Sequence, residues 1–316
     1  MIYSVRHITA FKYQPAIRES MMEVRLRPRS EGRQRCLSFQ LDLEPTANVM
    51  SYRDFLGNTV HHFDIAGTHT EIKVASQALV EVQSGDEGLD DGTWEELDRR
   101  VGAEDHWEML LPSQFACVSD SLKNLSRELK CERHGTPHEF LVGLNHAIYD
   151  TFKYVPNSTK VDSPIDEALE ARQGVCQDFS HIMIALARML QIPCRYVSGY
   201  LYHQPKENDR SLESASHAWI EALLPKFGWT AFDPTNNLVG GNRHIRVAIG
   251  RDYADVPPTR GVYKGEAQSE LAVAVKVTAA DMMAEDTGTT FVVRSRPTIA
   301  KPALKKNQEQ QQQQQQ

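Results

Sequence analysis

The hydrophobic pattern of this chain changes its period part-way along, and that change constrains the fold more than any other feature. In the first 83 residues, apolar and polar side chains alternate, for example over 22–26 and 37–43. A period of two residues is typical of strands that bury one face and expose the other. We therefore predict an antiparallel β domain over residues 1–83.

A turn signal within this region supports the same prediction. Gly57-Asn58 separates two strand-like stretches, the second of which covers 60–65. Such a dipeptide between strands is typical of the tight turn of a β-hairpin. Residues 72–82 have the composition of a further strand or two.

The pattern becomes helical in the second half of the chain. Residues 136–139 (TPHE) combine a capping box with a proline in the first turn, so a helix is predicted from 137 to about 150. A second set of apolar residues recurs at helical spacing over 179–190, and Pro193 stops it. This second helix is predicted to begin at about Cys176.

Three strand-like stretches follow the second helix, over 195–202, 217–224 and 229–232. The pattern of the second half of the chain therefore predicts helices followed by an antiparallel sheet. The predicted fold class is α+β.

These patterns divide the chain into five segments. Residues 84–93 are acidic and rich in glycine, so they are expected to link the β domain to a core over 94–265. A late strand over 271–278, within a C-terminal segment 266–300, either closes the core sheet or returns to the first domain. Residues 301–316 end in a glutamine run that is too polar to pack, and we expect them to be disordered.

The composition argues against several partners. The chain has 35 Lys and Arg against 42 Asp and Glu, a formal charge of −7, which is the wrong sign for neutralising nucleic-acid phosphates. No stretch reaches the roughly 18 apolar residues that a membrane helix needs, and Arg6 and His7 interrupt the start, so neither a membrane contact nor a secretory leader is expected. We expect a cytoplasmic protein. Five scattered cysteines without a CxxC pair argue against a disulfide framework or a zinc ribbon.

Cys176 is the strongest candidate for chemistry. A thiol becomes a nucleophile at neutral pH when its thiolate is stabilised, and the N–H groups and dipole of a helix N-terminus do this. Gly174 permits a tight entry to the helix and leaves space above the sulfur, and the Cys176 backbone N–H is a natural oxyanion donor. The alternative is a buried structural cysteine.

Two later residues favour the catalytic interpretation. His217 opens one predicted strand and Asp233 ends the next, on either side of a turn centred near residue 225. A hairpin would bring both to the same end of neighbouring strands, where the carboxylate orients the imidazole. His217 would then exchange a proton with Cys176, with Asp233 as its orienting partner. Taken alone, each of these residues also fits a structural strand or turn.

Several segments resemble the bacterial transglutaminase-like family of papain-like thiol enzymes, over roughly residues 152–265 and also upstream. These segments are 173–181 (QGVCQDFSH), 199–200 (GY), 216–219 (SHAW), 228–229 (GW), 233–236 (DPTN) and 244–253, with 26–28 (LRP) and 54–58 (DFLGN) resembling the β-type N-terminal domain of such proteins. The resemblance implies a core of helices packed on an antiparallel sheet. It also implies a triad of Cys176, His217 and Asp233 that transfers acyl groups through a thioester.

Three further residues are candidates for the cleft or the oxyanion site. Tyr154 offers a hydroxyl donor, or it packs in the core. Trp219 lies two positions after His217 on the same strand face, where it excludes water from the site or packs in the core. Gln177 follows the nucleophile and, with Asp178, also suits the start of the helix. His181 is off the i+4 alignment with Cys176, so we assign it a structural role.

No metal or cofactor is indicated by the sequence. His61, His62 and His69 are not accompanied by cysteines or carboxylates at a known ligand spacing. Gly240-Gly241 lacks the lysine and the strand-to-helix setting of a phosphate loop, and no acidic loop has the spacing of calcium ligands.

The sequence and the resemblance together predict a cysteine-dependent acyl-transfer enzyme that acts on a peptide or a small carboxamide. It is either a hydrolase of the protease or amidase type or a transglutaminase. Hydrolysis is the simpler expectation because nothing in the sequence marks an amine site. The alternative function is a non-catalytic papain-like module for binding or assembly, in which the thiol is idle. The glutamine run is chemically an acyl donor, but we interpret it as a low-complexity end.

Overall fold

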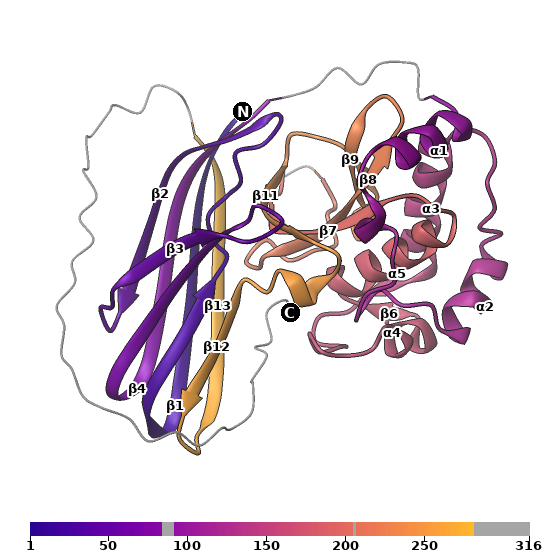
Figure 1. Ribbon diagram of the computed structural model, residues 1–316. Coiled ribbons are helices and arrows are strands. Elements are labelled where there is room, and N and C mark those ends of the chain that lie inside the picture. The colour runs from indigo at the N-terminus through magenta and orange to yellow at the C-terminus, as the bar shows by residue number, and fades with distance from the viewer. Residues whose placement is uncertain (84–91, 205–206, 281–316) are drawn as a thin grey trace.

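The computed structural model describes residues 1–83, 92–204 and 207–280. A domain of long strands lies beside a core of helices and shorter strands (Figure 1). The predicted α+β fold class is confirmed. Residues 84–91, which make up most of the predicted linker, and the predicted tail 301–316 lie outside the described residues.

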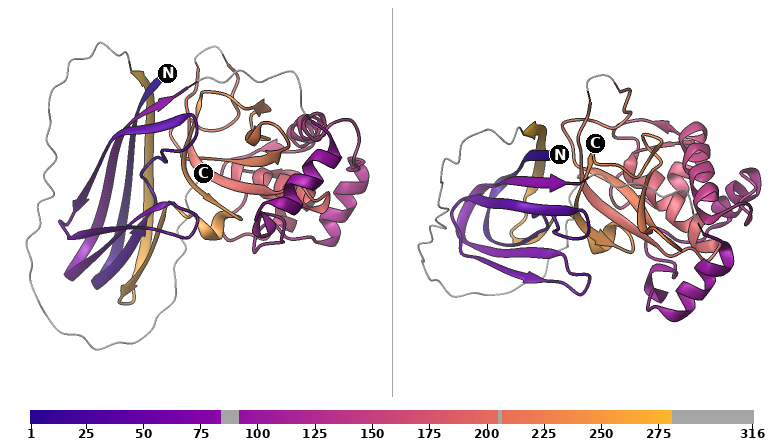
Figure 2. Two further views of the ribbon diagram at one scale, coloured as in Figure 1. Left: turned by 45° about the horizontal axis from the view of Figure 1, so that its top comes forward. Right: turned by 90° about the horizontal axis from the view of Figure 1, so that it is seen from above.

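The β domain is one six-stranded antiparallel sheet in the order β12-β1-β4-β2, with β13 also paired with β1, and β3 with β4. Burial alternates along β1 and β4, so each strand has one apolar face. The sheet curls so that these faces enclose a cluster that includes Phe11, Phe63 and Ile72 (Figure 2). The strands are β1 (Ile2–Val24), β2 (Gln34–Glu44), β3 (Val49–Arg53), β4 (Thr59–Val82), β12 (Thr259–Lys264) and β13 (Gln268–Ala280).

The two longest strands differ from the sequence prediction. The stretches 60–65 and 72–82 belong to one strand, β4, and 22–26 overlaps only the end of β1. The residues between these stretches interrupt the alternation, but β1 and β4 stay paired past them by shifting register on either side of Ile17. The hairpin at Gly57-Asn58 is confirmed, because β3 and β4 pair across it.

The last two strands correct the predicted domain boundary. The core was predicted to extend to residue 265, but β12 pairs with β1 and therefore belongs to the β domain. β13 also pairs with β1, so the late strand returns to the first domain and does not close the core sheet. The physical reason is that β1 is long enough to hold β12 and β13 end to end along one edge.

The core has a five-stranded antiparallel sheet in the order β10-β9-β8-β7-β11, and its helices lie on the side away from the β domain (Figure 1). A short parallel pair, β5 and β6, lies apart from this sheet. No helix of the described residues is long and apolar enough to cross a bilayer. The core elements are α1 (Trp94–Ala103), a 3-10 turn (Trp107–Met109), α2 (Asp120–Glu128), α3 (Pro137–Thr151), β5 (Lys153–Tyr154), α4 (Ile165–Ala171), β6 (Gln173–Gly174), α5 (Cys176–Met189), β7 (Cys194–Leu201), β8 (His217–Leu224), β9 (Gly228–Asp233), β10 (Leu238–Val239), β11 (His244–Gly250) and a 3-10 turn (Tyr253–Asp255).

Both predicted helices of the core are confirmed. The capping box of Thr136 and Glu139 starts α3, and α5 begins at Cys176. Every residue from Cys176 to Arg188 is buried, because α5 packs between β7 and β8 on one side and α2, α3 and α4 on others. A helix that is enclosed in this way holds its first residue in a fixed place relative to the sheet.

The β domain covers the edge strand β11 of the core sheet. The side-chain amide of Gln34 donates to the carbonyl of Arg246 (2.8 Å) and accepts from its N–H (2.8 Å). Asn58 makes the same pair of bonds with Ile249, at 2.8 and 2.8 Å. These two buried amides satisfy backbone groups that would otherwise be open to another strand. The β domain thereby fixes the strand that begins with His244.

Candidate active site

Cys176 lies at the first position of α5, where Asp178 organises the helix start. The Val175 N–H donates to Asp178 Oδ2 (2.8 Å), and the Thr159 hydroxyl donates to the same oxygen (2.5 Å). Burial raises the pKa of Asp178 to about 6, although these two hydrogen bonds act in the opposite direction. The first turn of α5 is therefore held by a buried carboxyl group next to the thiol.

Gly174 has a role that was not predicted. A Cβ atom at this position would lie 2.7 Å from Asp178 Oδ2 and 2.9 Å from Asp178 Cβ. The missing side chain thus makes space for the capping carboxyl group, while the space above the sulfur stays a prediction. The prediction that the residue permits a tight entry to α5 agrees with this contact.

The β8–β9 hairpin brings His217 and Asp233 together. The pairs Leu224 with Gly228 and Ile220 with Phe232 centre the turn on residue 226, one position from the predicted centre. His217 Nε2 donates to Asp233 Oδ2 at 2.7 Å, and the two residues are 2 % and 0 % exposed. This contact leaves Nδ1 as the ring nitrogen for Cys176.

Opposite charges stabilise this pair. Burial opposes the charge of His217, but Asp233, through its charge and a hydrogen bond, and then Cys176 raise the pKa of His217 to about 10. Burial also opposes the ionisation of Asp233, yet His217 and His244 hold the pKa of Asp233 well below its ordinary value. At neutral pH the pair is therefore an imidazolium and a carboxylate. Cys176 also contributes to the raised pKa of His217, so the thiol and the imidazole are neighbours.

The loop after β9 holds the Asp233 carboxylate. Oδ1 accepts from the backbone N–H groups of Thr235 (3.0 Å) and Asn236 (3.2 Å), and Oδ2 accepts from the Asn236 side chain (2.8 Å). The Asn236 side-chain oxygen accepts in turn from the N–H groups of Arg210 and Ser211. Asn236 therefore connects the carboxylate to the loop that precedes β8.

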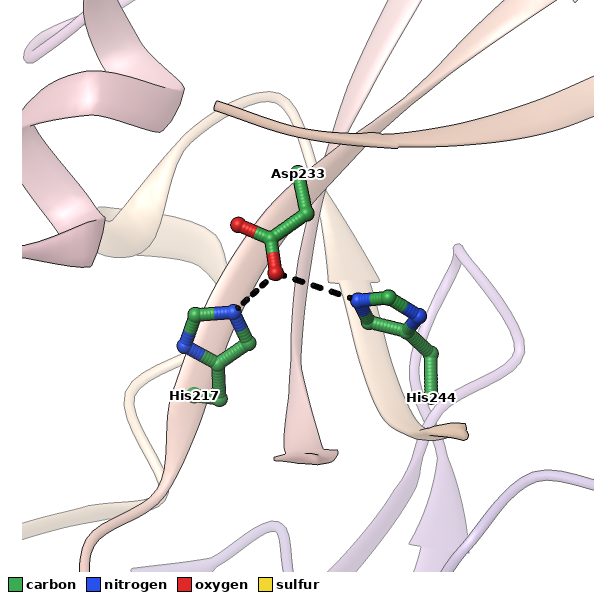
Figure 3. Close-up of side chains that lie close together, drawn as sticks. All are labelled: His217, Asp233 and His244. Atoms are coloured by element: carbon green, nitrogen blue, oxygen red, sulfur yellow. Dashed lines mark hydrogen bonds and ion pairs between the residues drawn. The ribbon is translucent and has the colours of Figure 1, made fainter. Parts of the chain in front are cut away.

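His244 is a member of this cluster that the sequence analysis missed. Its Nε2 lies 3.2 Å from Asp233 Oδ2, so two imidazoles face one carboxylate oxygen from either side (Figure 3). His244 opens β11, which is separated from β8 in the sheet by β7. No local pattern signals this contact, because it depends on the order of the strands in the sheet.

Trp219 packs against both imidazoles. Its ring lies 6.0 Å from that of His217 in a stacked arrangement and 4.9 Å from that of His244. The side chain is fully buried, as expected for a residue that excludes water from this cluster. Gly199 makes space for it, because a Cβ atom there would lie 2.6 Å from the Trp219 ring.

Tyr154 lies close to the thiol. Burial and the charge of Cys176 raise the pKa of Tyr154, while a hydrogen bond with the backbone of Leu212 lowers it. The tyrosine is half-buried and Leu212 is 38 % exposed. Tyr154 therefore has the thiol as one neighbour and an exposed residue as another.

Gln177 and His181 have structural contacts. The Gln177 amide donates to the carbonyl of Val161 (2.9 Å), so this side chain ties a preceding loop to α5, and its place in the cleft stays a prediction. His181 is buried between the rings of Phe115 and Tyr196 and accepts from the Tyr253 N–H, as its predicted structural role requires. Burial lowers the pKa of His181 to about 4.

The described residues contain one histidine and carboxylate cluster compact enough to consider for a metal ion, namely His217, Asp233 and His244, whose ligand atoms lie within 4.8 Å of one another. Both imidazoles bond to the carboxylate itself, so the cluster is a hydrogen-bonded network. His61, His62 and His69 are spread along β4 and have separate partners, Phe39, Asp64 and Ser20.

Two family models match this chain. Residues 3–81 match the bacterial transglutaminase-like N-terminal region, and residues 124–234 match the transglutaminase-like superfamily. The chain belongs to the transglutaminase-like superfamily. The second match contains the thiol, the imidazole and the carboxylate described above and ends before His244.

Relatives of this transglutaminase-like protein share both domains. An uncharacterized protein of Mycobacterium leprae is 34 % identical over 277 residues, which cover 87 % of this chain and 97 % of that protein. An uncharacterized protein of Mycobacterium bovis is 33 % identical over 290 residues, with 87 % and 92 % covered. A crystal structure from Cytophaga hutchinsonii, provisionally named a cysteine protease, has a TM-score of 0.69 at 22 % identity and covers 90 % of this chain and 92 % of that one. The two-domain fold is therefore shared as a whole.

Proposed function

We propose that this transglutaminase-like protein is a cysteine-dependent acyl-transfer enzyme that attacks the carbonyl of a peptide or carboxamide. The observation that carries the proposal is the position of the His217 ring, which has two neighbours. Its Nε2 lies 2.7 Å from Asp233 Oδ2, and Cys176 is close enough to raise the pKa of His217. An imidazolium that is held by a buried carboxylate stabilises a neighbouring thiolate and has a proton to give.

In the proposed first half-reaction, the Cys176 thiolate forms a C–S bond with the carbonyl carbon. The carbonyl π electrons move to oxygen and give a tetrahedral oxyanion. His217 then donates the proton on Nδ1 to the leaving nitrogen as the C–N bond breaks, and ammonia or an amine departs. The acyl group remains on the sulfur as a thioester, and His217 is left neutral with its Nε2–H on Asp233.

The second half-reaction returns the site to its starting state. Neutral His217 accepts a proton from water or from an amine, which attacks the thioester carbon. When the C–S bond breaks, the electron pair returns to sulfur, and the thiolate again faces an imidazolium. Water is the simpler acceptor and gives a hydrolase, whereas a primary amine gives a transglutaminase.

The proposed oxyanion donors are the backbone N–H groups at the start of α5 and the hydroxyl of Tyr154. The helix start supplies aligned N–H groups and a positive dipole end. The hydrogen bond from Leu212 lowers the pKa of Tyr154, as expected for a bond that is donated to the phenol oxygen, so the hydroxyl proton remains for an oxyanion.

A second candidate function has one observation in its favour. Cys176 is only 2 % exposed, and a thiol buried to this degree also fits a non-catalytic module for binding or assembly. In the catalytic proposal, a substrate reaches the sulfur past Tyr154 and Leu212, which is the half-exposed side of the site. The two functions differ in whether a small electrophile can reach the thiol.

Iodoacetamide labelling tests the proposal. Peptide mass spectrometry would follow the alkylation of all five thiols with time at several pH values. We expect Cys176 to react well below pH 8 and far faster than Cys194, a matched buried cysteine in which burial raises the pKa to about 12. The His217→Ala variant should lose this selectivity. Equal rates for all five thiols would overturn the catalytic proposal and favour the binding module.

The products then separate the kinds of acyl transfer. A glutamine-containing peptide is incubated with the protein, with and without a primary amine, and the products are weighed. An amine adduct identifies a transferase, conversion of Gln to Glu a deamidase, and chain cleavage a peptidase. The Cys176→Ala variant is the control, because it keeps the fold of α5 and removes the sulfur.

A further inference from the structure

The imidazole of His244 has a contact that no motif of the sequence assigns. Its Nε2 lies 3.2 Å from Asp233 Oδ2, the same oxygen that His217 bonds at 2.7 Å. His244 is 6 % exposed and Asp233 is 0 % exposed, so water does not substitute for this donor. Figure 3 shows the carboxylate between the two rings.

We infer that His244 is a positioning residue for the proposed acyl-transfer site, which holds the Asp233 carboxylate in the orientation that faces His217. This inference rests on the proposed function, because a positioning residue is useful only at a working site. The hydrogen bond between His244 and Asp233 is itself an observation of the structure. An anionic oxygen accepts several hydrogen bonds, and each donor restricts the rotation of the carboxyl group. Without His244, Oδ2 keeps only His217 and the Asn236 side chain as donors, so the carboxylate is held less firmly in the orientation that faces His217.

The surroundings of His244 fit this role. Trp219 packs on its ring at 4.9 Å, and the strand that carries it is fixed by the β-domain amides Gln34 and Asn58. Nε2 of His244 donates to Asp233, because a carboxylate only accepts hydrogen bonds. The other ring nitrogen, Nδ1, is buried and has no hydrogen-bond partner among the described residues, so the ring is held through Nε2.

The charged and titratable groups around His217 come from several elements. They are Cys176 on α5, Asp233 on β9, His244 on β11 and His203 after β7. His203 is paired with Asp209 at 3.2 Å and does not bond to Asp233. It is therefore a matched control, since it is a second imidazole near His217 that has no hold on the carboxylate.

Two amide substitutions of His244 that differ in side-chain length test the inference. In His244→Gln the amide nitrogen takes the place of Nε2 and can donate to Asp233, whereas in His244→Asn it is one methylene too short. The measurement is the titration of the His217 ring by NMR of nitrogen-labelled histidine, with the His217 signals assigned by their loss in His217→Gln. This readout does not require any substrate or catalysis.

We expect His244→Asn to lower the pH at which His217 titrates by about half a unit to one unit, because the carboxylate is less well aligned. His244→Gln and His203→Gln should stay close to the unmodified protein. If His244→Asn does not fold, His244→Phe keeps the ring against Trp219 without the donor and should show the same change. The inference would be overturned if the donor-free variants left the pH at which His217 titrates unchanged or raised it. Equal effects of His244→Asn and His244→Gln would overturn it as well. Failure of the acyl-transfer proposal would appear separately, as unselective alkylation of Cys176.

Discussion

The burial of Asp178 predicts how the free energy of unfolding changes with pH. The residue caps α5 from a position that is 3 % exposed, and its pKa is raised to about 6 from an ordinary value of 3.8. Between these two values the unfolded chain has lost the proton and the folded chain keeps it, so the free energy of unfolding falls as pH rises. Two pKa units correspond to about 3 kcal/mol, which is the largest penalty that ionised Asp178 can impose above pH 7. An asparagine keeps the oxygen that accepts from Val175 and avoids this penalty.

The assay is urea unfolding of the unmodified protein and of Asp178→Asn from pH 4 to pH 8. We expect the stability of the variant relative to the unmodified protein to improve by up to about 3 kcal/mol across this range, with the change centred between pH 4 and 6. Asp120→Asn is the control, because Asp120 is exposed and a hydrogen bond from Lys123 lowers its pKa, so any trend should be small and opposite. A relative stability of Asp178→Asn that is flat, or that falls as pH rises, would refute the reasoning that burial outweighs the two hydrogen bonds.

Two further predictions concern the proton on His217 and the contact between the domains. Turnover of a glutamine peptide should decline only above about pH 10, where His217 loses the proton that the leaving nitrogen needs, and a pH–rate profile that declines near 6.5, the ordinary value, would contradict this. Asn58→Ala should lower the free energy of unfolding by about 2–4 kcal/mol, because it leaves the buried N–H and C=O of Ile249 without their partners. Urea unfolding measures this loss, with Asn124→Ala on the exposed face of α2 as the control, and equal losses in the two variants would argue against the role of Asn58.

Much of the fold was predictable because its signals are local. The capping box at Thr136 and the apolar spacing after Cys176 locate α3 and α5 to within a residue or two. The strands β7, β8 and β9 follow stretches of continuous or alternating apolar residues, and the turn between β8 and β9 was predicted one position from its centre. These features depend on contacts between residues a few positions apart, so they can be recognised from the sequence alone.

The long strands and the domain boundary were not predictable in the same way. Nothing between residues 66 and 71 of β4 signals that the strand continues, because the continuity comes from pairing with β1. β12 and β13 both pair with β1, which requires β1 to be a long strand. The length of β1 is stabilised by its partner strands and cannot be read from the local sequence of β1.

The sequence by itself predicted the candidate residues of the site: a thiol at a helix start, with an imidazole and a carboxylate at one end of a hairpin. These assignments follow from local geometry, since a helix start and a two-stranded turn constrain the positions of their own residues. Only the tertiary structure decided that His244 joins the local donors Thr235 and Asn236 in holding the carboxylate, because His244 reaches Asp233 through the order of the strands in the core sheet. Hydrogen bonds between distant segments depend on the packing of whole elements, and the β domain that fixes β11 is part of that packing.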